Sequence, residues 1–274
     1  MSRADEPAGE LVAENRRLWD ERVPIHTGSS FYDLAGFRAG AEVLDAFQLA
    51  ELGDVTGLDL AHLQCHLGLD ALAWARRGAR VAGLDFSAPA VRAATELAAE
   101  VGLADRARFA AADVYDAVEV LGAESFDVVY TGGGALMWLP DIDRWARTVA
   151  QLLRPGGRLY LAEFHPLTGV LDDERGATAA RDYFARGAQT YDSPGSYADR
   201  TAETEHNTAT EWHRTLGDVL SAVAAAGLRI EFVHEHDVIP FQRYGALVAD
   251  GARFRYPAGS ARLPLMYSLA ASAA

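Results

Sequence analysis

The stretch LDLAHLQCHLGLDALAWARRGARVAGLDFS, residues 58–87, decides the fold. It opens on the apolar run 58–64, continues with the helical pattern of 68–77 and ends on a second apolar run, 80–86. A strand, a tight turn, a helix and a second strand in this order begin a βαβ unit. The turn after the first strand of a nucleotide-binding unit usually carries three glycines, whereas this turn carries only Gly68.

The same alternation continues along the chain. Helical patterns occupy residues 88–101 and 141–153, and short apolar runs occupy ARFAAAD (107–113), FDVVYT (126–131) and GRLYLAEF (157–164). Strands that alternate with helices at this spacing predict a mostly parallel sheet with helices on both faces. Ligands of such sheets bind beyond the carboxyl ends of the strands, and residues 62–70 form the first such strand end.

The segments that flank this series have other patterns. Residues 9–50 read as helices around a loop and predict an N-terminal cap. Residues 165–210 are rich in Tyr, His, Gly, Ser and acidic residues, with weak periodicity, and are longer than an ordinary connection. They predict a lid or substrate-binding insert, and a variable surface loop is the alternative. We therefore expect a cap at 1–50 and a main domain at 51–274, with the insert at about 165–212.

The C-terminal part returns to a regular pattern. Leu216, Val219, Leu220 and Val223 lie on one helical face, and the runs LRIEFVHEH (228–236) and LPLMYSLAAS (263–272) predict strands. A terminal strand that follows a loop fits an antiparallel hairpin that closes the sheet. The expected sheet therefore has seven strands, mostly parallel, with an antiparallel last strand.

Composition excludes several classes of mechanism. The chain contains no lysine, which removes the P-loop lysine, Schiff-base lysine and Ser–Lys catalysis. The single cysteine, Cys65, excludes an intramolecular disulfide and a multi-cysteine zinc site, although a His/carboxylate metal site stays open. A net charge of −14 with dispersed arginines disfavours nucleic acid and anionic membranes, and no signal or membrane span is visible. We expect a cytoplasmic protein with a small-molecule partner, and a homodimer is compatible with the sequence.

The series resembles the class I S-adenosylmethionine-dependent methyltransferases. The resemblance rests on the turn with its helix, on GLDFS, AADVYD and FDVVYTGGG, and on LRPGGRLYLAEFHP, five segments in order over residues 57–163. It implies a Rossmann-like fold and S-adenosyl-L-methionine as the cofactor. The variant turn LQCHLGLD, together with NRRLWDERVPIH near the N-terminus, is similar to a bacterial subgroup of this family. We expect methyl transfer to an O, N or C nucleophile of a small molecule, such as a specialised metabolite.

The resemblance assigns residues to the nucleoside end of the cofactor. Asp85 ends the second strand, where a carboxylate accepts both ribose hydroxyls, and Ser87 leaves it free by capping the next helix. Asp113 and Val114 correspond to the pair that recognises adenine, with a helix cap as the alternative role of Asp113. Phe86 is expected to pack against the adenine or to lie in the core.

The turn itself departs from the family pattern. His62, Gln64, His66 and Gly68 stand where the family has an acid and three glycines. We expect Gly68 to approach the methionyl part of the cofactor, with Gln64 and His66 bonding around its carboxylate or the substrate; both side chains pointing into the protein is the alternative. The loss of the acid at His62 puts the ammonium contact in doubt, and a backbone carbonyl near Thr131 is the expected substitute.

The remaining candidates concern the acceptor. His165 follows the fifth strand and is the candidate general base, because the pKa of an imidazole suits proton removal at neutral pH; a structural histidine is the alternative. Aromatic and imidazole side chains can bind a neutral or cationic acceptor, or they can pack the cap and the insert. The candidate substrate-binding residues are Trp19, His26, Trp138, Tyr191, His206, Trp212 and His213.

Two other functions compete with methyl transfer. A nicotinamide dehydrogenase shares the strand order and the acid after the second strand, but the sequence lacks its G-x-G-x-x-G turn. A protein of the same fold could instead bind S-adenosylmethionine without transferring its methyl group, as a non-methylating enzyme or a regulatory module. Turnover to S-adenosylhomocysteine distinguishes this alternative from a methyltransferase.

Overall fold

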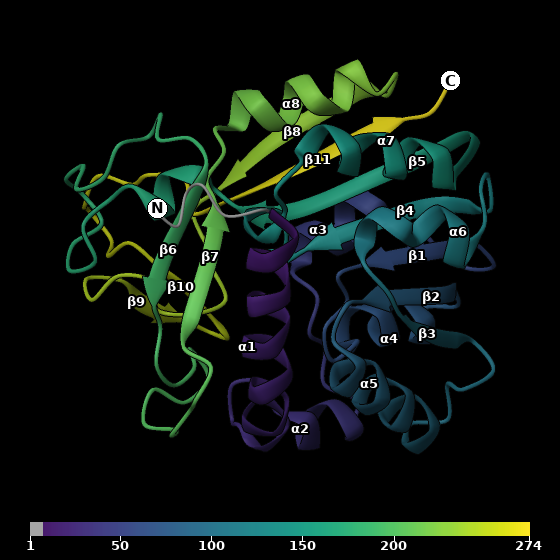
Figure 1. Cartoon of the computed structure of the whole chain (residues 1–274), viewed down its shortest axis with the longest axis horizontal. Helices are drawn as coiled ribbons and strands as arrows, with labels where there is room; N and C mark the ends of the chain where they lie inside the picture. The colour runs from purple at the N-terminus through teal and green to yellow at the C-terminus, as the bar shows by residue number, and fades with distance from the viewer. Residues whose placement is uncertain (1–7) are drawn as a thin grey trace.

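The computed structural model describes residues 8–274 and contains one seven-stranded sheet (Figure 1). Its strands are β1 (Asp59–Leu63), β2 (Arg80–Asp85), β3 (Ala107–Ala111), β4 (Phe126–Gly132), β5 (Leu153–Phe164), β8 (Arg229–His236) and β11 (Met266–Ser272). They lie in the order β3-β2-β1-β4-β5-β11-β8, and β11 pairs antiparallel with both β5 and β8. The predicted mostly parallel sheet with an antiparallel last strand is confirmed.

Helices cover both faces of this sheet (Figure 1). The helices that follow α1 (Ala8–Gly28) are α2 (Leu34–Arg38), α3 (Ala46–Leu52), α4 (Leu69–Arg76), α5 (Ala88–Glu100), α6 (Ala117–Leu121), α7 (Ile142–Leu152) and α8 (Leu216–Ala225). Trp145 of α7 lies in one apolar core and Trp74 of α4 in the other, and both are fully buried. Parallel strands run outward in both directions from β1 and β4, so the topological switch point lies between these two strands.

The N-terminal helix joins the insert. Helix α1 (Ala8–Gly28) packs on a hairpin of β6 (Ala188–Asp192) and β7 (Thr208–Trp212), so the insert is more ordered than its sequence pattern indicates. The buried side chain of Asn15 donates to the carbonyl of Thr210 at 2.7 Å and accepts its N–H at 2.9 Å. Because an amide that pairs both backbone groups of one residue fixes direction as well as distance, α1 and the insert are held as one unit.

A second hairpin was not expected from the sequence. Strands β9 (Val248–Asp250) and β10 (Arg253–Arg255) lie between β8 and β11, where the sequence indicates only a loop. A separate apolar cluster forms in this region from Leu171, Ile239, Tyr244, Leu247, Tyr256, Leu265 and Met266. Within residues 8–274, no helix combines the length and the apolar character needed to cross a bilayer.

Arg22 offers a test of the unit formed by α1 and the insert. Its guanidinium donates to the carbonyl oxygens of Leu18, His206 and Ser193. We expect Arg22→Met to lower the free energy of local unfolding of the insert by about 1.5 to 3 kcal/mol, because hydrogen bonds from a charged donor are lost. Limited proteolysis followed by mass spectrometry should then show faster cleavage between the two strands of the β6–β7 hairpin. Arg17→Met, on the exposed face of the same helix, is the control, and equal cleavage of both variants would contradict the prediction.

Candidate functional site

A cavity of about 940 Å³ lies beyond the carboxyl ends of β1, β2, β4 and β5. Its walls come from α1, from the turn after β1, from the loops after β2 to β5, and from the insert and the segment before β10. The volume is near the upper end of the range of about 300–1,000 Å³ found for small-molecule sites. The cavity therefore has room for a nucleoside cofactor and a second small molecule.

The turn after β1 keeps the backbone shape of a glycine-rich turn without the glycines. Gln64, His66 and Gly68 have φ values of 57°, 47° and 71°, all in the left-handed region that glycine prefers. Gln64 Nε2 donates to the carbonyl of Ala135 at 2.8 Å, and the His66 N–H donates to Asp85 Oδ2 at 2.8 Å. A left-handed backbone is unfavourable for residues other than glycine, and these hydrogen bonds offset that cost. The side chains of Gln64 and His66 both line the cavity, as expected.

Gly68 has a different role from the one that the sequence suggested. A Cβ atom at this position would lie 2.8 Å from the Phe109 ring and 2.9 Å from the Ala94 methyl group, and Gly68 is not part of the cavity wall. The prediction that Gly68 makes the closest approach to the cofactor is therefore wrong. The glycine is needed because α4 begins here in close contact with β3 and α5.

The residues predicted for the nucleoside end of the cofactor line the cavity. Asp85, Phe86, Asp113 and Val114 all line it, and Asp85 is only 6% exposed. Asp85 accepts N–H groups from His66 at Oδ2 and from Ser87 at Oδ1, and burial raises the pKa of its carboxyl to about 6. Each carboxylate oxygen accepts more than one hydrogen bond, so acceptor capacity remains toward the cavity.

Asp113 combines the two roles considered for it. Its carboxylate accepts the N–H of Tyr115 at 3.0 Å and caps the short helix Val114–Asp116, and the residue also lines the cavity. The cap fixes the direction of the carboxylate at the cavity wall. A capping role therefore does not exclude adenine recognition.

Thr131 does not contribute to the cavity. It is fully buried inside β4, and the wall begins one residue later with Gly132, Gly133 and Gly134. A carbonyl near Thr131 that contacts the ammonium group stays a prediction, and the adjacent residues that line the cavity are Gly132 and Gly133.

Glu163 has a role that the sequence did not indicate, although it lies at the end of β5 in the motif LAEF. Its buried carboxylate accepts backbone N–H groups from Gly134 at 2.6 Å, Ala135 at 2.8 Å and Leu136 at 3.0 Å, and one from Phe164 at 2.6 Å. A flexible run of glycines loses much conformational entropy on ordering, and these bonds offset that loss. The carboxylate therefore holds the β4 loop as a fixed wall of the cavity.

Aromatic and imidazole rings close the cavity above the turn. The rings of Trp19 and Trp138 lie 5.2 Å apart, and those of His26 and His66 lie 4.9 Å apart. The predicted residues Trp19, His26 and Trp138 are thus brought together, from α1 and the β4 loop. We call this group the aromatic cage, formed by Trp19, His26, Tyr32, His66, Trp138 and Tyr197.

A hydrogen-bonded chain runs through the aromatic cage. His26 Nδ1 lies 2.7 Å from His66 Nε2, and His26 Nε2 lies 2.7 Å from Ser196 Oγ in the insert. Burial lowers the pKa of His66 to about 3 and that of His26 to about 4, so both imidazoles are neutral at pH 7. The cap, the turn and the insert therefore meet through uncharged polar side chains.

The histidine pair predicts a pH dependence of stability. Because the unfolded chain takes up protons near about pH 6.5 and the folded pair does not, stability falls as the pH decreases from about 7 to about 5. Asp70 and Asp85, with pKa values of about 6, act in the opposite direction. We expect the double variant His26→Asn/His66→Asn to lose less stability on acidification than the unmodified chain, by on the order of 1 to 2 kcal/mol per histidine. Thermal unfolding at both pH values measures this difference, and equal losses would contradict it.

The insert supplies a further group of side chains. Tyr191 Oη lies 3.2 Å from His213 Nε2, and both line the cavity together with Trp212. His206 does not belong to this group: it is exposed, and only its backbone is bound, by Arg22 and Glu21. The prediction of His206 as a substrate contact is therefore wrong.

His165 lines the cavity but is not available as a free base. Its Nδ1 accepts the N–H of Leu167 at 3.2 Å, and its Nε2 lies 2.9 Å from Glu235 Oε1. Both ring nitrogens are thus occupied, and the residue is only 4% exposed. The structure supports the alternative role, in which His165 fixes the chain where it leaves β5.

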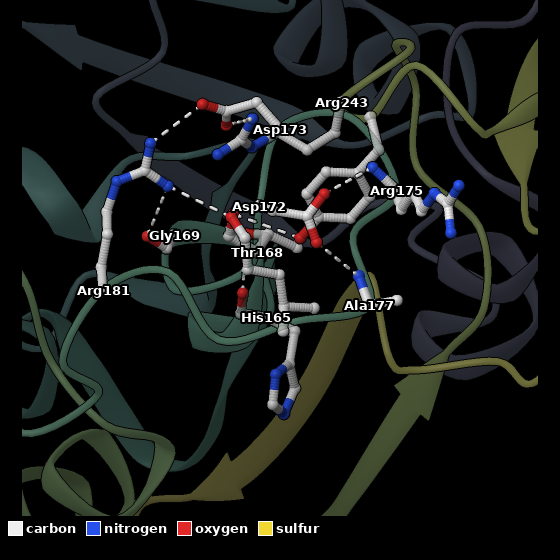
Figure 2. Close-up of polar contacts among 11 residues, drawn as sticks. His165, Thr168, Gly169, Asp172, Asp173, Arg175, Ala177, Arg181 and Arg243 are labelled. Carbon is white, nitrogen blue, oxygen red and sulfur yellow. Dashed lines mark hydrogen bonds and ion pairs between the residues drawn. The ribbon is translucent and has the colours of Figure 1, made fainter.

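The sequence also did not indicate two arginines that line the cavity and follow His165 in the chain. Arg181 and Arg243 line the cavity and share Asp173, at 2.9 Å and 2.7 Å (Figure 2). Asp172 accepts the N–H groups of Arg175, Ala177 and Thr178, which shapes the same loop. These contacts connect the chain after β5 to the segment before β9. Within residues 8–274, no group of three or more His, Cys, Asp or Glu side chains is placed to hold a metal ion.

Comparison with known proteins agrees with this geometry. Residues 61–161 match a family model described as a methyltransferase domain. Methyltransferase GfsG of Streptomyces halstedii is 36% identical over 129 residues, which cover 46% of this chain and 45% of that protein. Erythromycin 3''-O-methyltransferase of Saccharopolyspora erythraea is 31% identical over 163 residues, 58% of this chain and 52% of that protein. The chain thus spans about half the length of these curated relatives.

Solved structures extend the likeness to most of the chain. A crystal structure of an S-adenosylmethionine-dependent methyltransferase from Mesorhizobium loti has a TM-score of 0.62 and 25% identity, and the match covers 86% of this chain and 99% of that one. The predicted fold is confirmed, and residues 61–161 match a methyltransferase domain.

Proposed function

We propose that this chain, whose residues 61–161 match the methyltransferase domain, is a class I S-adenosylmethionine-dependent methyltransferase that acts on a small molecule. The observation that carries the proposal is the bond between the left-handed turn and Asp85 at the edge of a cavity of about 940 Å³. The names of the relatives, one of which is an erythromycin O-methyltransferase, support a specialised metabolite as the acceptor. An oxygen, nitrogen or carbon nucleophile is compatible with the cavity.

The residues present fit the cofactor. Asp85 presents acceptors for the ribose hydroxyls, and Asp113 with the N–H of Val114 presents one acceptor and one donor for adenine. Two buried polar atoms of the turn region, His62 Nδ1 and Gln64 Oε1, have no partner among residues 8–274. Because buried polar groups are normally hydrogen-bonded, these atoms indicate a polar ligand beside the turn.

The proposed chemistry depends mainly on position. The cofactor supplies a methyl group on a positively charged sulfur, which leaves as a neutral thioether in an in-line displacement. The aromatic cage and Met137 exclude water from the cavity, and the π faces of Trp19 and Trp138 favour positive charge near them.

The cap and the insert complete the site in this proposal. Residues Trp19 and His26 of the cap, and Tyr191, Tyr197, Trp212 and His213 of the insert, form one wall of the cavity or border it. Because α1 and the insert are bound to each other through Asn15 and Arg22, we propose that they select the acceptor together.

Calorimetric titration with S-adenosylmethionine, S-adenosylhomocysteine and NAD tests the proposed function. We expect micromolar binding of the two sulfur compounds and none of NAD. Incubation with S-adenosylmethionine and a panel of small-molecule acceptors should then release S-adenosylhomocysteine. Binding without turnover on any acceptor would favour the alternative, a cofactor-binding protein that does not methylate. Absence of binding would overturn the proposal.

A further inference from the structure

The turn after β1 has no acidic side chain at the position where the family pattern has one, so the negative charge beside the cofactor's ammonium group must come from elsewhere. His62 occupies the position of that acid at the end of β1, and burial lowers its pKa to about 3, so its imidazole is neutral. The ring lines the cavity and packs edge-on against Tyr130, with 4.7 Å between ring centroids. His62 therefore offers a polar atom to the cavity but no negative charge.

A carboxylate contacts the same tyrosine through its hydroxyl. Asp70, the second residue of α4, lines the cavity, and its Oδ2 accepts the hydroxyl of Tyr130 at 2.8 Å. Gln48 Nε2 donates to the same hydroxyl at 2.7 Å, which directs the tyrosine proton toward Asp70. The orientation of the carboxylate is thus fixed from two helices and one strand.

The remaining oxygen of Asp70 is without a partner. Within residues 8–274, no hydrogen bond reaches Asp70 Oδ1 and no arginine or histidine lies within ion-pair distance of the carboxylate. The nearby cation, Arg253, is paired with Asp45 instead. A carboxylate removed from water without a cation is costly, and desolvation accordingly raises the pKa of Asp70 to about 6.

The free acceptors in this part of the cavity define the group that fits them. Tyr130 contacts both residues, Asp70 through its hydroxyl and His62 through its ring; among residues 8–274, His62 Nδ1 has no hydrogen-bond partner and no donor reaches Asp70 Oδ1. A primary ammonium has three N–H donors, a positive charge and no acceptor. We propose that Asp70 binds the ammonium group of the cofactor's methionine portion, so that the negative charge comes from the first turn of α4 instead of the end of β1. This inference rests on the proposed function.

Removal of the charge from Asp70 tests the inference. Asp70→Asn keeps an oxygen for the Tyr130 hydroxyl, removes the negative charge and replaces the second acceptor oxygen by an NH₂ donor. We expect the Kd for S-adenosylhomocysteine to rise by about 10- to 100-fold, in the range of a hydrogen bond between charged groups. The Kd for desamino-S-adenosylhomocysteine, which lacks the amino group, should stay within about twofold of the value for the unmodified chain, since that compound has no ammonium to lose.

A control variant and the two ligands distinguish ammonium binding from a structural role of Asp70. Glu42→Gln removes another cavity-lining carboxylate, one that is paired with Arg77, and should leave both Kd values unchanged. If Asp70→Asn lost affinity equally for both compounds, Asp70 would have a structural role and the inference would be overturned. Unchanged binding of both would mean that the carboxylate serves another cation, such as an amine of the acceptor, and would also overturn it. If the unmodified chain bound neither compound, the proposed function would fail together with the inference.

Discussion

Replacing Asp85 by alanine is expected to weaken binding of S-adenosylhomocysteine by about 1.5 to 3 kcal/mol, which is a rise in Kd of about 10- to 150-fold. The carboxylate is buried at the cavity wall and its two oxygens already hold the backbone of His66 and Ser87. The variant therefore loses the acceptors that we propose for the ribose hydroxyls, and also the hydrogen bond to the His66 N–H in the left-handed turn. Calorimetric titration measures the change directly.

Two further variants divide this loss between its causes. Asp85→Asn keeps an oxygen for one backbone N–H but cannot accept at both sides, so its Kd should lie between those of the unmodified chain and of Asp85→Ala. Asp33→Asn, at an exposed carboxylate of the cavity rim that caps α2, is the matched control. An unchanged Kd in Asp85→Ala would remove Asp85 from the cofactor site.

The sequence predicted those features that depend on local periodicity. Helices α5 and α7 carry apolar residues at helical spacing, and the strands are short apolar runs, so their ranges were close to those observed. Asp85 and Asp113 were also predictable, because each lies at or just after the end of a strand and must therefore lie at the carboxyl edge of the sheet. These inferences need only the chain order and the sheet topology.

Features that depend on side-chain direction or on distant contacts were not predictable. The sequence shows that Gly68 is the last glycine of the turn, but not that its missing side chain makes room for Phe109 rather than for a ligand. The junction of Asn15 with Thr210 joins residues 195 positions apart and has no local pattern. The three-residue strands of the β9–β10 hairpin are too short to show alternation.

His165 shows how a correct position can lead to a wrong role. The sequence places this histidine after β5 at the cavity, and the structure agrees. Its chemistry depends on Glu235 and on the N–H of Leu167, which occupy both ring nitrogens. The sequence could not indicate the contact with Glu235, because that residue lies on β8, far along the chain.

Glu163 is expected to be the most sensitive single residue for stability. Its carboxylate accepts four backbone N–H groups, three of them from the β4 loop. In Glu163→Gln the amide NH₂ must face at least one of these donors, so buried N–H groups lose their acceptor at about 1 to 3 kcal/mol each. We expect a loss of unfolding free energy on the order of 3 kcal/mol, and a lower melting temperature by about 6 to 12 °C for a chain of this size.

Thermal unfolding followed by circular dichroism tests this expectation, with Glu119→Gln on the exposed surface of α6 as a control that should change stability by less than about 0.5 kcal/mol. Because the carboxylate holds the glycine loop that walls the cavity, Glu163→Gln should also raise the Kd for S-adenosylhomocysteine below its melting temperature. If Glu163→Gln had the same melting temperature as the unmodified chain, the loop would hold its shape without Glu163. A destabilised variant with unchanged affinity would instead show that the loop does not contact the cofactor, which would confine the role of Glu163 to folding.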